Sequence, residues 1–175
     1  ELNAYTTKEK IYFYSSVLKN HYERSFELLT DITFNSIFPE KEIEKEKGVI
    51  LEEMAMYKDT PDDLIFDQFD EMVFSGHPLG KNILGTEESV NQFEHKDFVD
   101  FAQRNLAKGQ VAYLSVANIS FDKVTKLAEK YLSHLILSEK PKKNRPAYQY
   151  KPQIITTQKS ITQAHVLMGQ PALPV

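Results

Sequence analysis

Two glutamates, Glu46 and Glu53, lie one heptad apart in a segment with helical patterning. At about 100° per residue, both carboxylates fall in the same arc as Ile43, Ile50 and Met54, and such an arc normally faces the core. Burying an ionised carboxylate without a partner is costly, so the pair needs a metal, a cation or a hydrogen-bond network. The alternative is a structural role, in which the two glutamates pair with Lys or Arg or extend out to solvent.

The remaining chain alternates between helical spacing and short β-rich runs. Thr60 suits a helix cap, and Pro39 and Pro61 suit the first turns of helices. The pattern predicts helices over residues 21–36, 40–58, 61–74, 95–105 and 121–134. It predicts strands before Lys8 and over residues 11–17, 111–117, 153–157 and 164–168.

Strands at both ends of the chain and helices in its middle predict an α+β fold. We expect a two-layer domain, with a mostly antiparallel sheet and helices packed on one face. The length of 175 residues suits one domain, residues 1–175. The chain begins and ends in apparent structure, so we expect it to be a truncated piece of a longer domain.

Composition excludes some classes of function. About two-fifths of the residues are hydrophobic and a quarter charged, as in globular proteins. The net charge of -4 argues against nucleic acid as a partner, because phosphate binding favours a basic surface. There is no cysteine, so neither a disulfide nor thiolate chemistry is available. No apolar run approaches the ~18 residues that a membrane span needs.

Four separated motifs occur in an order that points to a known family. The first motif is the segment 1–9, which contains Asn3-Ala4-Tyr5-Thr6. The second is the segment 46–53, Glu-Lys-Gly-Val-Ile-Leu-Glu-Glu. The third and fourth are the segments 59–63 and 77–86, and the last of these begins His-Pro-Leu-Gly. Together they resemble the insulinase/pitrilysin-type zinc metallopeptidases, the inverzincins. The resemblance covers roughly residues 1–118 and implies a LuxS/processing-peptidase-like metallopeptidase fold.

The resemblance also implies a metal site. In this family an H-x-x-E-H helix supplies two histidine ligands and a general base, and a later glutamate completes the zinc site. By motif match that later glutamate is Glu53, and Glu46 would orient a ligand histidine. The intact enzyme would then hydrolyse peptide bonds with a zinc-activated water.

The H-x-x-E-H motif is absent from these residues. None of the five histidines is followed by x-x-Glu-His, and we expect structural roles for all of them: His21, His77, His95, His134 and His165. Because the motif helix precedes the Asn-Ala-Tyr-Thr strand in the family, we expect that truncation removed it. The 175-residue chain alone is expected neither to hold zinc tightly nor to cleave peptides.

Substrate and partner expectations follow from the same resemblance. Asn3 and Ala4 resemble the edge strand along which family members bind an extended peptide through main-chain hydrogen bonds. The alternative for Asn3 is an ordinary strand-end residue. The intact protein is expected to pair this domain with a homologous domain or subunit that encloses a chamber. Its localisation is open, with a bacterial cytoplasmic or periplasmic protein expected.

Two other interpretations remain. The first is that the chain comes from a non-catalytic scaffold or partner subunit of the same family, which binds peptides or a sister subunit. The presence of both Glu46 and Glu53 favours the catalytic version. The weakest alternative is an unrelated α+β domain with coincidental motif matches.

Overall fold

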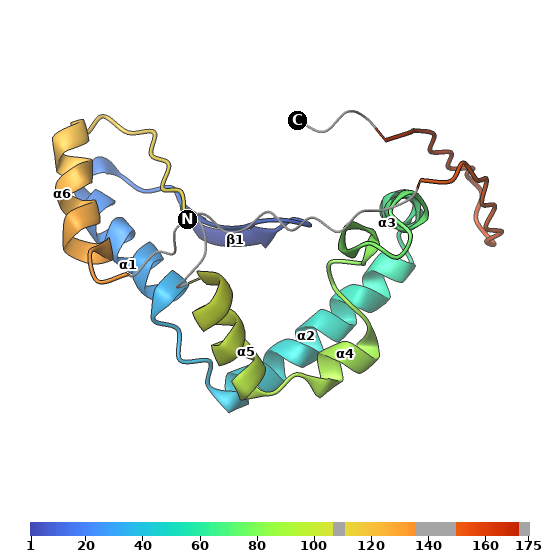
Figure 1. Cartoon of the computed structure of the whole chain (residues 1–175), viewed down its shortest axis with the longest axis horizontal. Coiled ribbons are helices and arrows are strands. Elements are labelled where there is room, and N and C mark those ends of the chain that lie inside the picture. The colour runs from blue at the N-terminus through green and yellow to red at the C-terminus, as the bar shows by residue number, and fades with distance from the viewer. Residues whose placement is uncertain (107–110, 136–149, 172–175) are drawn as a thin grey trace. The chain divides into compact units, whose positions relative to one another are not determined.

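A computed structural model describes residues 1–106, 111–135 and 150–171 of the chain (Figure 1). The described residues form two compact units, each considered by itself below. The first unit comprises Glu1–Ile43 and the described residues from Phe93 to Leu135. The second comprises Glu44–Gln92 and residues 150–171.

The first unit begins with a β-hairpin. Strand β1 (Leu2–Thr6) pairs antiparallel with β2 (Ile11–Ser15), so that Tyr5 lies opposite Tyr12. The rings of these two tyrosines stack with centroids 4.4 Å apart. Aromatic cross-strand pairs of this kind stabilise antiparallel sheets and favour the observed register. The predicted strands at this end of the chain are therefore confirmed.

Helices α1 (Tyr22–Phe34) and α6 (Phe121–Leu132) lie side by side in the first unit (Figure 1). Phe26 on α1 is 1% exposed, and its ring lies 4.5 Å from that of Tyr113 and 5.9 Å from that of Tyr131. At the surface of the same helix pair, Lys130 donates to Glu23 at 2.9 Å. This hydrogen bond lowers the pKa of the Glu23 carboxyl.

The other helical segments of the first unit are short. A 3₁₀ turn, η1 (Lys19–His21), precedes α1. Helix α5 (His95–Phe101) continues into a π-helical turn, η3 (Ala102–Leu106). Glu94 caps α5, and Asp97 accepts the Glu94 backbone N–H in return. The predicted helix over residues 95–105 is thus confirmed, with a change of helix type in its second half.

The second unit consists of helices and extended chain. Helix α2 (Glu40–Lys58), whose first residues belong to the first unit, is followed by α3 (Pro61–Val73), the 3₁₀ turn η2 (Pro78–Gly80) and α4 (Glu87–Gln92). The sequence did not predict α4. Thr86 and Ser89 cap its start reciprocally, since each backbone N–H binds the other's hydroxyl, at 2.9 and 3.1 Å.

The strands predicted over residues 111–117, 153–157 and 164–168 are wrong for this structure. These segments are not strands, and the described sheet is the β1–β2 pair. Their apolar side chains are largely exposed, with Leu114 at 84%, Ile154 at 95% and Val166 at 83%. β-Branched and apolar runs favour strands only where a neighbouring strand and a buried face are available. The mixture of helices and a small antiparallel sheet is nevertheless an α+β fold.

Candidate functional site

Helix α2 buries only part of the face that its sequence predicts. Ile43 and Met54 are buried, at 7% and 8% exposure, whereas Glu46 and Glu53 are both exposed. Relative to Ile43, the two carboxylates lie about 60° and 80° to one side, and Met54 lies about 20° to the other. The predicted stripe was therefore too wide, and the two glutamates flank the buried face instead of lying within it.

The side chain that completes the buried face is Lys47. Its side chain is only 14% exposed, and it lies about 40° from Ile43, on the side away from the glutamates. The aliphatic stem of a lysine can cover apolar surface while its ammonium reaches a polar partner. Periodicity arguments count Lys47 as polar, so they place the centre of the stripe too close to Glu46 and Glu53.

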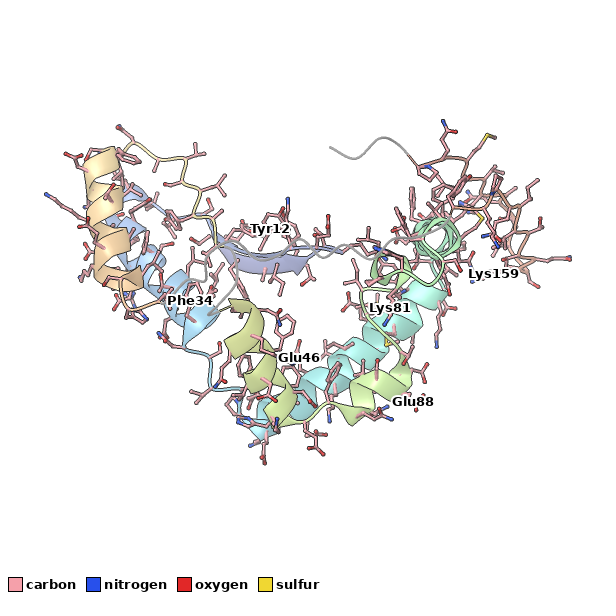
Figure 2. All side chains as sticks on the ribbon, viewed as in Figure 1. Tyr12, Phe34, Glu46, Lys81, Glu88 and Lys159 are labelled. Atoms are coloured by element: carbon pink, nitrogen blue, oxygen red, sulfur yellow. The ribbon has the colours of Figure 1, made fainter. Side chains whose placement is uncertain are left out.

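Glu46 and Glu53 share one exposed flank of α2 (Figure 2 labels Glu46). Seven residues of helix separate them by about 10 Å along the axis and about 20° around it. Among the described residues, neither carboxylate has a hydrogen bond or ion pair. The expectation that the carboxylates need a buried partner is therefore removed, and both remain available to a ligand from solvent or from another part of the protein.

Polar contacts hold α2 against α4. Lys47 Nζ donates to the backbone oxygen of Asn91 at 3.4 Å and to Glu44 at 2.7 Å. At the other end of α2, Lys58 Nζ lies 2.5 Å from Glu87, and its hydrogen bond lowers the pKa of the Glu87 carboxyl. The two helices therefore run antiparallel, side by side (Figure 1). Both lysines lie on the side of α2 away from Glu46 and Glu53, so this pairing leaves the flank that carries the two glutamates uncovered.

A third lysine, Lys159, reaches the C-terminal end of α2. Its ammonium donates to the backbone oxygen of Lys58 at 2.9 Å. A cation is favourable at a helix C-terminus, where the last carbonyls have no intrahelical partner. Sequence reasoning missed Lys47, Lys58 and Lys159, because their partners lie far away along the chain and no local pattern marks them.

The described histidines have structural positions. His77 is buried at 9% exposure, and its Nδ1 accepts the Leu79 N–H at 3.2 Å within the turn that η2 forms. His95 begins α5, and its Nδ1 lies 2.8 Å from the Phe38 backbone oxygen. The turn role of His77 and the helix-start role of His95 are confirmed.

The other three histidines are scattered. His21 ends the η1 turn, His134 follows the end of α6, and His165 lies in extended chain. Over residues 1–106, 111–135 and 150–171, no three His, Asp or Glu side chains come together as a metal-binding group. A zinc site needs at least three protein ligands, and its carboxylate ligands bind through oxygen. Glu53 fits one such ligand, but the described residues do not fit a complete site.

Asn3 and Ala4 lie in the middle of β1, whose residues are all exposed. Among the described residues, β1 pairs with β2 alone, so its other edge offers backbone groups to a further strand. Asn3 Oδ1 accepts the backbone N–H of Ala4 at 2.8 Å. β1 and the glutamates of α2 belong to different units, which are described separately.

Comparison with known families defines the class of protein. The model for insulinase, peptidase family M16, matches residues 1–87, and the model for the peptidase M16 inactive domain matches residues 92–175. The chain belongs to the insulinase family of peptidases. The sequence-based resemblance is thereby confirmed, and the interpretation as an unrelated α+β domain is excluded.

Named relatives support the same family. The chain is 42% identical over 139 residues to an uncharacterized zinc protease of Rickettsia felis, covering 79% of this chain and 34% of the relative. It is 32% identical over 176 residues to one of Bacillus subtilis, covering 100% and 42%. It is 34% identical over 134 residues to a probable mitochondrial-processing peptidase subunit beta of Schizosaccharomyces pombe, covering 77% and 29%.

The chain spans between 29% and 42% of the length of these three relatives. No helix among the described residues is long and apolar enough to cross a bilayer.

Proposed function

We propose that the intact protein is a zinc-dependent endopeptidase and that α2 supplies Glu53 as one zinc ligand. The observation that carries this proposal is the exposed flank of α2, where the Glu53 carboxylate has no partner among the described residues. Family membership and relatives named zinc proteases support it. Glu46, one heptad earlier on the same flank, would orient a histidine ligand.

The remaining zinc ligands would come from residues outside this chain, on the H-x-x-E-H helix that the family resemblance implies. The general base would lie on that helix as well. A ligand on a well-packed helix is held more precisely than one on a loop. Glu53 lies within the 19-residue helix α2, which the lysine contacts join to α4 on its other side.

In this proposal the substrate is an extended peptide that adds to the free edge of β1 near Asn3 and Ala4. Backbone hydrogen bonds at a sheet edge bind many peptide sequences, with side-chain pockets adding selectivity. The chain would form part of one two-layer catalytic domain, residues 1–175, and a homologous domain or subunit would enclose the substrate. A bacterial cytoplasmic or periplasmic enzyme fits this proposal.

The second candidate is a non-catalytic partner subunit that binds peptides or a sister subunit. The match of residues 92–175 to the peptidase M16 inactive-domain model raises this candidate, although the same residues also align with the Bacillus subtilis zinc protease. In such a subunit, Glu46 and Glu53 would serve only as solvated side chains on a helix surface.

A hydrolysis assay on two proteins separates these candidates. We expect the full-length protein to cleave a fluorogenic peptide, to lose its activity with a zinc chelator and to regain it with added zinc. The 175-residue chain alone is expected to be inactive, because it contributes a single zinc ligand. A full-length protein without zinc-dependent cleavage would favour the non-catalytic subunit. Zinc-dependent cleavage by the 175-residue chain would contradict the proposal that the other zinc ligands lie outside this chain.

A further inference from the structure

The hydrogen bonds of the hairpin determine which residues of β1 face its outer edge, called the free edge here because no other described residue pairs with it. Glu1 and Ser16 exchange both backbone hydrogen bonds, each 3.0 Å long, and at the turn Thr7 N–H donates to Lys10 at 2.8 Å. Bonded and non-bonded pairs alternate along an antiparallel ladder. Between these two ends, Asn3 and Tyr5 therefore bond to β2 through their backbones.

The intervening residues, Leu2, Ala4 and Thr6, direct their backbone N–H and C=O groups towards the free edge. These groups would bind an added peptide strand. Asn3 cannot offer its own backbone to that peptide, because its backbone already bonds to Tyr14 within the ladder. Its contribution to the edge must come from its side chain.

The side chain of Asn3 already accepts a hydrogen bond from the central backbone N–H of that edge, which belongs to Ala4. Its Oδ1 accepts the Ala4 N–H at 2.8 Å, so this donor is not free for a peptide carbonyl. The whole of β1 is exposed, and a single neutral hydrogen bond in water contributes little net stability. The contact can therefore be displaced without disturbing the ladder between β1 and β2.

We propose that Asn3 acts as a gate on the free edge of β1. Its side chain keeps the Ala4 N–H hydrogen-bonded until an extended peptide displaces that side chain. This inference rests on the peptide-binding role proposed above. The gate opens when Asn3 rotates about its side-chain torsions, and the Ala4 N–H then donates to a peptide carbonyl. An unpaired edge donor also invites pairing with another chain, so the closed gate protects the edge in the absence of substrate.

Substitutions of Asn3 in the full-length protein test the gate. Asn3→Ala removes the competing acceptor, and we expect the KM for a fluorogenic peptide to fall by about fivefold, the effect of losing one competing hydrogen bond. Asn3→Asp supplies a charged acceptor that holds the Ala4 N–H more strongly, so KM is expected to rise. Because the gate acts on binding, kcat should change by less than about twofold in both variants. A KM that is unchanged or raised in Asn3→Ala overturns the gate.

Ala4→Pro separates failure of the gate from failure of the peptide site itself. Proline removes the Ala4 N–H but is tolerated on an edge strand where that N–H faces outward. We expect KM to rise about tenfold, with unchanged zinc content and circular dichroism. If this variant binds peptide as well as the wild type does, peptides do not use this edge and the proposed peptide site fails. If its KM rises but that of Asn3→Ala does not fall, only the gate fails.

Thr6→Pro provides a second variant for the peptide site. It removes another outward N–H, beyond the reach of Asn3, and the same rise in KM is expected.

Discussion

Replacing Glu53 by glutamine in the full-length protein is expected to weaken zinc binding and to lower kcat/KM, each by about a hundredfold or more. Glutamine keeps the size of the side chain but replaces an anionic oxygen donor with a neutral one. Changes to residues that only orient metal ligands typically lower metal affinity or activity by about 10–100-fold. Losing a ligand should lower them at least as much. Zinc affinity would be measured by competition with a chelator, and kcat/KM with a fluorogenic peptide.

Neighbouring glutamates provide graded controls for this experiment. Glu52 is also exposed but points about 100° away around α2, so Glu52→Gln should leave zinc affinity and rate near those of the wild type. Glu46→Gln should show an intermediate loss of about tenfold, because Glu46 would act through a ligand histidine. Because all three side chains are exposed, none of the substitutions should unfold α2. Full zinc occupancy and full rate in Glu53→Gln would refute the ligand assignment.

Replacing Phe26 by alanine is expected to destabilise the first unit by about 3–5 kcal/mol, the range for truncating a buried aromatic residue. Phe26 is 1% exposed and lies between the rings of Tyr113 and Tyr131, so the substitution leaves a cavity between α1, the 111–117 segment and α6. The same packing, together with the hydrogen bond to Tyr22, raises the pKa of the Tyr113 hydroxyl.

Urea denaturation of the full-length protein measures this loss. With an m-value of about 2 kcal/mol/M, the midpoint should fall by about 1.5–2.5 M. Leu28 on the same helix is 44% exposed, and Leu28→Ala should cost less than about 1 kcal/mol. Equal destabilisation by the two variants would show that Phe26 is not the centre of this core.

The elements that the sequence predicts well are those with strong local signals. The span of α2 was predicted correctly from Glu40 to Lys58, because Pro39 precedes it and apolar residues recur with helical spacing. The strands β1 and β2 were predicted from their aromatic and β-branched runs, and the structure adds their pairing as a hairpin. Helix α4 was missed because its six residues are mostly polar, and it is held by Thr86, Ser89 and the lysines of α2.

The errors arise where non-local contacts decide the outcome. The run over residues 111–117 has strand-like composition, yet its ordered contacts are side-chain contacts with α1, such as the 2.7 Å hydrogen bond between Ser115 and Tyr22. The buried face of α2 includes the stem of Lys47, which a periodicity argument counts as polar. Which edge of β1 the Ala4 N–H faces depends on the register of the hairpin, and no pattern within a single strand reveals that register.

Zinc-edge anomalous diffraction from crystals of the full-length protein tests the assignment of Glu53 most directly. The account predicts a single strong anomalous peak with a Glu53 carboxylate oxygen about 2.0–2.2 Å from the metal, and with Glu46 outside the coordination sphere. A zinc ion coordinated without Glu53 in a catalytically active crystal form would contradict the central claim.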